Sequence, residues 1–480
     1  MKLTFWGAAQ QVTGSMYLLE LDDGYKILID CGMDMEKDRG KDPTDELIIG
    51  ERPSNSIFPF DPSDLDVVLL THAHLDHSGL LPNLYREGFE GQILCTAPTA
   101  ELTYLLLQDS AMLNQRKLSK LNKRFSQKKN VKVPNYVKEW YVSRHVEEAY
   151  EQFVPISFNS RFRLRKGVDV TFVPAGHLLG AAHILLQIDD NGTKKSIGFS
   201  GDIGRYNYPL LVDPQPLPAV DYLLCETTYG SRLHISVQEA EDEFARIIED
   251  TCVKIAGRLI IPAFSVGRTQ ALLYTLHQLS VAGKLPPIKI FSDSPLALQS
   301  TKIYEKYNRY LNKTAQEFKN DNDWLFDFDN LVYVENLKDS KQLSNYNQPC
   351  IIISSSGMME GGRIQHHVAK NLNNPYCTIL MVGYSAEGTL GHELLMGKKE
   401  LRIGDNLVPV LAKVVYTDVL SGHGDQKDLL KFVKHQAPEH LKQLFLIHGE
   451  PQSMEDFKNL VQEHGYTKVT IPHKGQEVVL

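Results

Sequence analysis

The sequence predicts an α/β protein in which a domain with a parallel sheet is inserted into a strand-rich first domain. Short apolar runs separated by Gly and Asp-Asp-Gly turn signals open the chain, which is the pattern of an antiparallel meander. From Asp221 to Gly391 strands alternate with longer amphipathic helices, as in βαβ units on a parallel sheet. After Gly391 the strand-rich pattern returns, so an insertion fits the chain better than domains in series.

The first segment, residues 1–220, should begin with the meander and continue through a polar surface loop over 32–61. A buried strand over 67–70 comes next, and Ser78 is a good N-cap for a helix over 79–87 because its hydroxyl can bind an N–H group of the first turn. A strand over 92–96 and a helix over 99–120 follow. Two later strands should end just before His177 and Asp202.

The inserted segment, residues 221–391, should fold as a domain of its own. Its strands are predicted over 222–226, 258–263, 288–292, 350–354 and 378–382, and its helices over 236–254, 269–279, 296–310 and 364–372. The last segment, residues 392–480, should return to the first domain with strands over 408–416, followed by a helix, a strand and a helix. A chain of 480 residues is long enough for two or three domains.

Composition indicates a soluble cytoplasmic protein. The hydrophobic fraction is 42%, the net charge is −8, and no segment approaches the roughly 18 apolar residues of a membrane span. The six scattered cysteines form no Cys-x-x-Cys pair and should be reduced core residues. With this charge, contact with nucleic acid requires a local basic patch. The stretch 116–132 offers one, although a solvated helix face explains it equally well. A homodimer is compatible with the sequence.

A histidine-rich stretch directly after the strand over 67–70 predicts a metal site. His72, His74, Asp76 and His77 place three imidazoles and a carboxylate within six residues. A solvated turn or a set of buried structural histidines would also account for single members of this group, but packing gives no reason for four N and O donors together. A packed strand that ends in such donors holds them on rigid backbone.

Other donors recur far along the chain, and most of them also lie at strand ends. His177 and Asp202 follow predicted strands, and His423 stands in Ser421-Gly-His-Gly-Asp425. Nitrogen and oxygen donors without cysteine suit two borderline divalent ions, Zn²⁺ first and Mn²⁺ second. Asp30 ends another apolar strand, where it either caps a turn or orients a metal-bound histidine.

These motifs together resemble the metallo-β-lactamase fold and its β-CASP branch of nucleic-acid-processing nucleases. The His-x-His-x-Asp-His pattern at 72–77 matches the fold, and Glu226-Thr-Thr-Tyr-Gly230 and Pro262-Ala-Phe-Ser-Val-Gly-Arg268 match the branch. Asp293-Ser-Pro295 and the run 354–363 match it as well. The resemblance covers nearly the whole chain and implies an αββα sandwich with an inserted parallel-sheet α/β β-CASP domain, and an active site between the two.

The resemblance also implies roles for the donors. One zinc would be held by His72, His74 and His177, and the second by Asp76, His77 and His423, with Asp202 between the two ions. Asp30 would orient a ligand, as would His448 unless it only forms a turn. Glu226 would hold His392, which would protonate the leaving oxygen. The alternative is that Glu226 has only a structural role, as a carboxylate that caps the end of a strand. The catalytic residues that we predict are therefore Asp76, Glu226 and His392.

Two turns between strand and helix are candidate phosphate holders, by their hydroxyls, glycines and arginines. The residues are Ser265, Arg268, Ser355, Ser356 and Arg363. Glycine-rich turns without a ligand are the alternative.

The function that follows is a zinc-dependent ribonuclease, in which a hydroxide bridging two zinc ions hydrolyses RNA phosphodiester bonds, whether inside the RNA or from an end. A DNA nuclease is the first rival, and His423 argues against it because the DNA-directed members of the branch tend to have an apolar residue there. A small-molecule hydrolase of the lactonase or thioesterase type and an inactive scaffold subunit are the other rivals. The inserted segment argues against the hydrolase, and the filled ligand positions argue against the scaffold.

Overall fold

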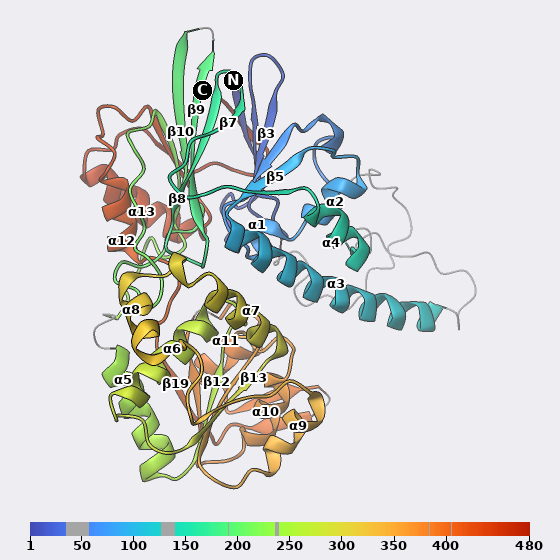
Figure 1. Ribbon diagram of the computed structural model, residues 1–480, viewed down its shortest axis with the longest axis vertical. Helices are drawn as coiled ribbons and strands as arrows, with labels where there is room; N and C mark the ends of the chain where they lie inside the picture. Colours follow the sequence, from blue (N-terminus) through green and yellow to red (C-terminus); the bar gives the residue numbers. More distant parts are fainter. Residues whose placement is uncertain (35–56, 126–139, 191, 236–239, 384, 405) are drawn as a thin grey trace. The chain divides into compact units, whose positions relative to one another are not determined.

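The computed structural model describes residues 1–480 except 35–56, 126–139, 191, 236–239, 384 and 405 (Figure 1). The chain forms two compact units. Unit 1 comprises residues 1–204, 214–232 and 423–480, and unit 2 comprises residues 205–213 and 233–422. The predicted domain boundaries at 220 and 391 stay predictions.

Two mixed sheets form the centre of unit 1. The first has the order β22-β1-β2-β3-β4-β5-β6, with the bounds β1 Lys2–Phe5, β2 Tyr17–Glu20, β3 Lys26–Ile29, β4 Val67–Leu69, β5 Gln92–Cys95, β6 Phe153–Pro155 and β22 Gln476–Val479. The second has the order β21-β20-β11-β10-β9-β8-β7, with the bounds β7 Phe162–Arg165, β8 Val168–Pro174, β9 Ala182–Asp190, β10 Thr193–Phe199, β11 Tyr222–Glu226, β20 Gln443–Ile447 and β21 Val469–Thr470. The antiparallel pairs β1–β2 and β2–β3 confirm the predicted meander.

Helices cover the outer faces of these sheets. Their bounds are α1 Leu75–Ser78, α2 Leu81–Arg86, α3 Ala97–Phe125, α4 Ser143–Tyr150, α12 Gln426–Val433 and α13 Pro451–Glu463. Alternation along the strands gives each sheet two apolar faces: Leu3 and Phe172 lie in the core between the sheets, whereas Val68 packs under α2 and Leu223 under α12. The predicted αββα sandwich is therefore confirmed.

The helix predicted over 79–87 is wrong at its start. A short helix, α1, already begins at Leu75 and ends at Ser78. The next helix, α2, starts at Leu81. Pro82 has no N–H to continue the first turn, so a new helix must start beside it. The Ser78 hydroxyl caps nothing and donates to the backbone oxygens of Ala73 and His74.

Unit 2 is built on a six-stranded parallel sheet with the order β14-β13-β15-β12-β16-β19. The bounds are β12 Arg258–Pro262, β13 Lys289–Asp293, β14 Leu331–Tyr333, β15 Cys350–Ser354, β16 Cys377–Met381 and β19 Lys413–Tyr416. Its helices are α5 Ala240–Ile248, α6 Arg268–Val281, α7 Pro295–Lys306, α8 Lys313–Asn322, α9 Leu337–Gln342, α10 Ile364–Asn371 and α11 Leu390–Leu395. The predicted alternation of strands and helices on a parallel sheet is confirmed.

The strands predicted over 408–416 belong to two different sheets: β18 Asn406–Pro409 pairs with β17 Glu400–Ile403, and β19 joins the parallel sheet. One helix of unit 2 differs from the prediction. The helix predicted over 296–310 ends at Lys306 and is followed by a short 3₁₀ turn, Asn308–Tyr310. Part of the helix predicted over 236–254 lies outside the described residues.

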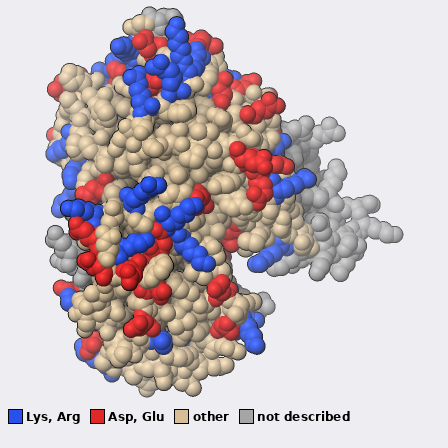
Figure 2. Space-filling view, viewed as in Figure 1, with Lys and Arg blue, Asp and Glu red and all other residues tan. Residues whose placement is uncertain are grey.

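The cysteines, the apolar segments and the surface charges can be compared with the predictions made from composition. All six cysteines are buried and unpaired, as expected. No helix in the described part of the chain is long and apolar enough to span a membrane. Basic side chains on the face drawn in Figure 2 gather at its upper end and are interleaved with acidic ones elsewhere. Most of the stretch 116–132 lies outside the described residues.

Candidate metal centre

The donors of unit 1 follow the carboxyl ends of buried strands. β4 leads into His72 and His74, and α1 then carries Asp76 and His77. In the same way His177 follows β8, Asp202 follows β10 and His448 follows β20. Chain segments far apart in sequence therefore meet at one edge of the sandwich.

Four donors form a first group, His72, His74, His177 and Asp202, whose ligand atoms lie within 4.8 Å of one another. The Nε2 atoms of His72 and His177 both lie 3.4 Å from Oδ2 of Asp202. Burial is the largest cause that lowers the pKa of His74 to about 3, and it also lowers the pKa values of His72 and His177. Neutral imidazoles can offer lone pairs to a cation.

Asp76, His77 and His448 form a second group. Nε2 of His448 lies 3.5 Å from Oδ2 of Asp76. The other oxygen of Asp202, Oδ1, lies 3.2 Å from Nε2 of His77 and 3.7 Å from Nε2 of His448. Asp202 therefore presents one carboxylate oxygen to each group.

The donors fit two divalent cations. Nε2 of His72, both oxygens of Asp202 and Nε2 of His448 are buried and have no hydrogen-bond partner among the described residues. Burial of a polar group without a partner costs about 1–3 kcal/mol in proteins, and far more for a charge. Imidazole and carboxylate donors converging on such atoms are the ligand set of zinc and similar ions.

Asp30 holds the ring of His77 in place. Its Oδ2 accepts a hydrogen bond from Nδ1 of His77 at 2.7 Å, while the Thr71 backbone N–H and hydroxyl both donate to its carboxylate at 2.8 Å. Burial lowers the pKa of His77, but the carboxylates of Asp202 and Asp30 outweigh it and raise that pKa well above its ordinary value. The contact directs Nε2 toward the cluster, and the role of Asp30 in orienting a metal ligand stays a prediction.

Glu226 contacts His423, a partner that the sequence did not predict for it. Oε1 of Glu226 lies 3.1 Å from Nδ1 of His423 and also accepts the backbone N–H of Ile203 at 2.7 Å. Burial lowers the pKa of His423, but Glu226 and Asp202 outweigh it and raise that pKa to about 9. Nε2 of His423 lies 3.8 Å from Oδ2 of Asp202, so this pair borders the cluster.

Three family models match successive parts of the chain. They are the metallo-beta-lactamase superfamily over residues 10–235, the Beta-Casp domain over 269–394 and the Zn-dependent metallo-hydrolase RNA specificity domain over 407–472. A ribonuclease of Thermus thermophilus is 32% identical over 478 residues, which is 100% of both chains. This protein therefore belongs to the β-CASP family of metallo-β-lactamase-fold proteins.

Two further relatives of this β-CASP protein come from archaea. An RNase J-like protein of Methanocaldococcus jannaschii is 32% identical over 98% of each chain. The transcription termination factor FttA of Methanosarcina mazei is 29% identical over 96% of this chain and 68% of its own.

The cluster exchanges the expected places of two histidines in this β-CASP chain. The sequence predicts that His423 joins Asp76 and His77 as a metal ligand and that His448 only supports the ligands. In the structure His448 lies with Asp76 and His77, and His423 contacts Glu226. The signal for His448 was present: Ile447 ends a buried strand immediately before it, as Leu69 does shortly before His72. His423 follows no strand directly, since β19 ends at Tyr416.

His392 lies in unit 2, whereas the cluster belongs to unit 1. It stands in the first turn of α11, where its backbone N–H bonds to the hydroxyl of Thr389, the cap of that helix. Its predicted role as the partner of Glu226 stays a prediction.

Four of the predicted phosphate holders in unit 2 have protein contacts. Oγ of Ser294 lies 3.4 Å from Oγ of Ser265 and 3.0 Å from Oγ of Ser355. Arg268 donates to the Val382 carbonyl at 2.5 Å, and Arg363 donates to Asp293 and to the carbonyls of Val334 and Glu335. The Ser356 hydroxyl is buried without a partner in the described structure. Their phosphate role stays a prediction.

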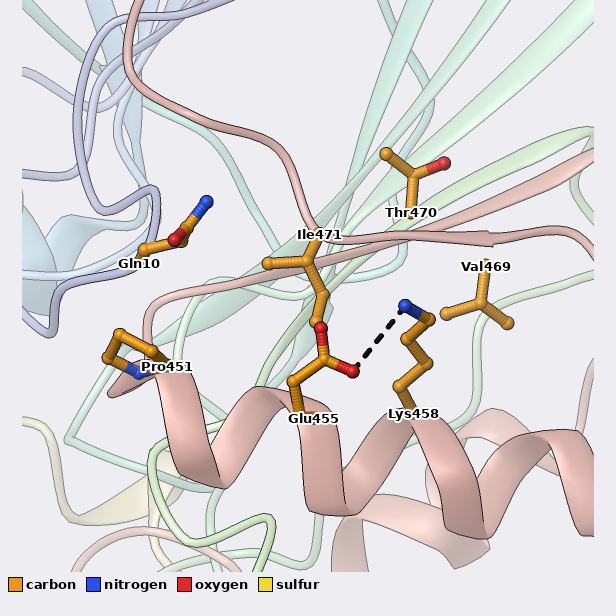
Figure 3. Close-up of a pocket in the computed structure, with 7 residues that line it drawn as sticks. All are labelled: Gln10, Pro451, Glu455, Lys458, Val469, Thr470 and Ile471. Atoms are coloured by element: carbon orange, nitrogen blue, oxygen red, sulfur yellow. Dashed lines mark hydrogen bonds and ion pairs between the residues drawn. The ribbon is translucent and has the colours of Figure 1, made fainter.

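A surface pocket of about 330 Å³ lies elsewhere in unit 1, between α13 and β21 (Figure 3). Lys458 and Glu455 form an ion pair at 3.4 Å on the α13 side of the pocket, and Val469 and Ile471 supply apolar walls. None of the candidate metal ligands lines it, so this pocket is separate from the cluster.

Proposed function

We propose that this protein is a zinc-dependent ribonuclease that hydrolyses RNA phosphodiester bonds with two zinc ions per chain. The observation that carries the proposal is Asp202, whose two unpaired oxygens face two groups of imidazoles while the Glu226–His423 pair lies beside them. The Thermus relative bears the name ribonuclease, which supports RNA as the substrate. Manganese is the alternative metal, and a cytoplasmic location belongs to the same proposal.

The two groups divide the ligands between the ions. His72, His74 and His177 would hold one ion and Asp76, His77 and His448 the other, with Asp202 shared. When bound, two such ions lower the pKa of a water molecule to near 7 and neutralise charge on a phosphoryl group. Asp30 keeps the His77 ring aimed at Asp202, and Thr71 keeps Asp30 in place by two hydrogen bonds.

His423 is placed to transfer a proton to the leaving oxygen. Its side chain is 20% exposed, whereas those of His72, His77 and Asp202 are at most 2% exposed. Glu226 accepts the hydrogen bond from Nδ1, and Nε2 is the ring nitrogen on the side of the cluster, 3.8 Å from Oδ2 of Asp202. Departure of a ribose alkoxide requires a general acid, and an imidazolium fixed by a carboxylate can supply the proton.

A direct assay compares cleavage of labelled RNA and DNA of one sequence. We expect rapid cleavage of RNA alone. DNA cut as fast as RNA would make the protein a DNA nuclease, and failure to bind either would favour a small-molecule hydrolase.

Metal analysis of protein purified without added metal tests the proposal that each chain binds two zinc ions. We expect about two zinc ions per chain. Less than one tightly bound ion would contradict the two-metal site and favour an inactive scaffold.

A further inference from the structure

Three loops in unit 2 meet at the carboxyl edge of the parallel sheet. Phe264 and Ser265 follow β12, Ser294 follows β13, and Ser355 follows β15. From β13 the chain continues outward to β14, whereas from β15 it crosses β12 to reach β16, so the connections diverge between β13 and β15. Ligands of open α/β sheets bind at such a point, outside the carboxyl ends of the strands.

Hydroxyl groups from all three loops lie together at this edge. Ser294 is central, with its Oγ 3.0 Å from that of Ser355 and 3.4 Å from that of Ser265. Because Oγ of Ser294 accepts the N–H of Ala297 at the start of the twelve-residue helix α7, its own hydrogen can point away from the helix. Hydroxyls beside a helix N-terminus suit a phosphate.

The charge beside these hydroxyls does not repel an anion. Asp293 directly precedes Ser294, but its carboxylate is fully buried and bound at 2.6 Å by each of Arg363, His367 and Ser340. Arg363 therefore neutralises an acid that would otherwise oppose phosphate binding. Arg268, on α6, adds a positive charge to the same edge.

Phe264 supplies an aromatic ring beside the hydroxyls. Its side chain is 36% exposed, although it directly follows the buried strand β12 and Ala263. The ring lies against Gly357, where a Cβ atom would come within 3.0 Å of it, and the Arg268 guanidinium lies 5.7 Å from its centroid. An exposed ring fixed in this way is a platform for a nucleobase.

We propose that Phe264, Ser265, Ser294 and Ser355 form a subsite for one RNA nucleotide, with its base stacked on Phe264 and its phosphate bound by the hydroxyls. The proposal rests on the proposed ribonuclease function and adds the part of the substrate that unit 2 recognises. Because every base has a π face, the subsite binds RNA without regard to sequence.

The first test measures kcat and KM on a short RNA for Phe264→Leu, Phe264→Trp and Trp324→Leu. We expect Phe264→Leu to raise KM about tenfold with kcat within about twofold, the size of effect that loss of one stacked base produces. Phe264→Trp keeps a stacking ring and should keep the wild-type KM. Trp324→Leu removes another exposed ring of unit 2, 55% exposed, and should change neither constant. An unchanged KM in Phe264→Leu overturns the proposal.

The second test separates base from phosphate by inhibition with adenosine 5′-monophosphate and ribose 5-phosphate. The wild-type protein should bind the nucleotide about tenfold more tightly, and Phe264→Leu should lose only this preference. Ser355→Ala, checked for an unchanged melting temperature, should weaken both compounds. Equal loss of both in Phe264→Leu overturns the stacking role. RNA cleavage by the wild type is scored separately, so failure of the ribonuclease function is distinguishable from failure of the subsite.

Discussion

Each unit contains a carboxylate buried beside more than one neighbouring donor group, Asp202 in unit 1 and Asp293 in unit 2, and these two differ in their partners. Asp202 of unit 1 lies near five imidazoles, yet neither of its oxygens has a hydrogen-bond partner in the described structure. Asp293 of unit 2 is equally buried, but Arg363, His367 and Ser340 bind both of its oxygens at 2.6 Å.

The difference separates a ligand from a structural acid. The buried charge of Asp293 is satisfied by the protein itself, so no further partner is required. The carboxylate of Asp202 faces imidazoles but accepts no hydrogen bond in the described structure, so both of its oxygens remain available to a bound cation. Substitutions of the two residues should therefore affect different properties.

Replacing Asp202 should have the largest effect. Asp202→Asn removes charge from both groups at once, so we expect loss of most bound metal and a fall in RNA cleavage of more than about 100-fold, beyond the effect of residues behind the ligands. Elemental analysis and cleavage rates check this. Full metal content in the variant would show that Asp202 is not shared between two ions.

His423→Ala should separate metal binding from proton transfer. If His423 is the general acid, kcat falls by roughly 10²–10⁴-fold while the zinc content stays at the wild-type value. His448→Ala is the matched variant, because His448 belongs to the group with Asp76 and should lose metal as well. Loss of zinc in His423→Ala would mean that His423 is a ligand of the second zinc ion, as the sequence predicted.

The sequence contained the local part of this site but not its assembly. Donors at strand ends, such as His72 and His177, could be found because a buried strand immediately or shortly before them fixes their position. His448 also follows a buried strand directly, but His392 and His423 have no such signal and could not be assigned from the sequence. Which of them meets Glu226 depends on how distant segments pack.

The same distinction applies to the fold. Alternation of strands and helices predicted the parallel sheet of unit 2, and short apolar runs predicted the meander of unit 1, because burial on one or both faces leaves a period in the sequence. The broken helix at Ser78 was missed, although Pro82 marks the place where the new helix starts. The contact of Arg363 with Asp293 was missed because it joins residues from different strands and helices.

Asp293→Asn should lower the free energy of unfolding. Removal of one partner from a buried charged network costs about 3–5 kcal/mol, so the unfolding transition of unit 2 should move to lower denaturant while metal content stays unchanged. Burial raises the pKa of Asp293, but His367, Ser340 and Arg363 outweigh it and lower that pKa. The stability it contributes is therefore complete above the unfolded pKa of about 3.9 and is lost as pH falls through the lower folded value.

Urea unfolding at neutral pH and at pH 3 measures this difference. The wild type should lose more stability than Asp293→Asn on acidification. An equal loss would mean that Asp293 is not ionised in the folded protein.

Asp30→Asn should have the smallest effect of the four. The amide can still accept one hydrogen bond from Thr71, but it no longer holds the His77 ring as a carboxylate does, so metal affinity should fall about 10–100-fold without loss of the fold. Titration with a competing chelator measures the affinity of each ion. Because His77 contacts only Oδ1 of Asp202, the weakened ion should be the one held by Asp76 and His448, and the other should bind as in the wild type. Equal weakening of both ions would mean that Asp30 supports the whole edge of the sheet and not one ligand.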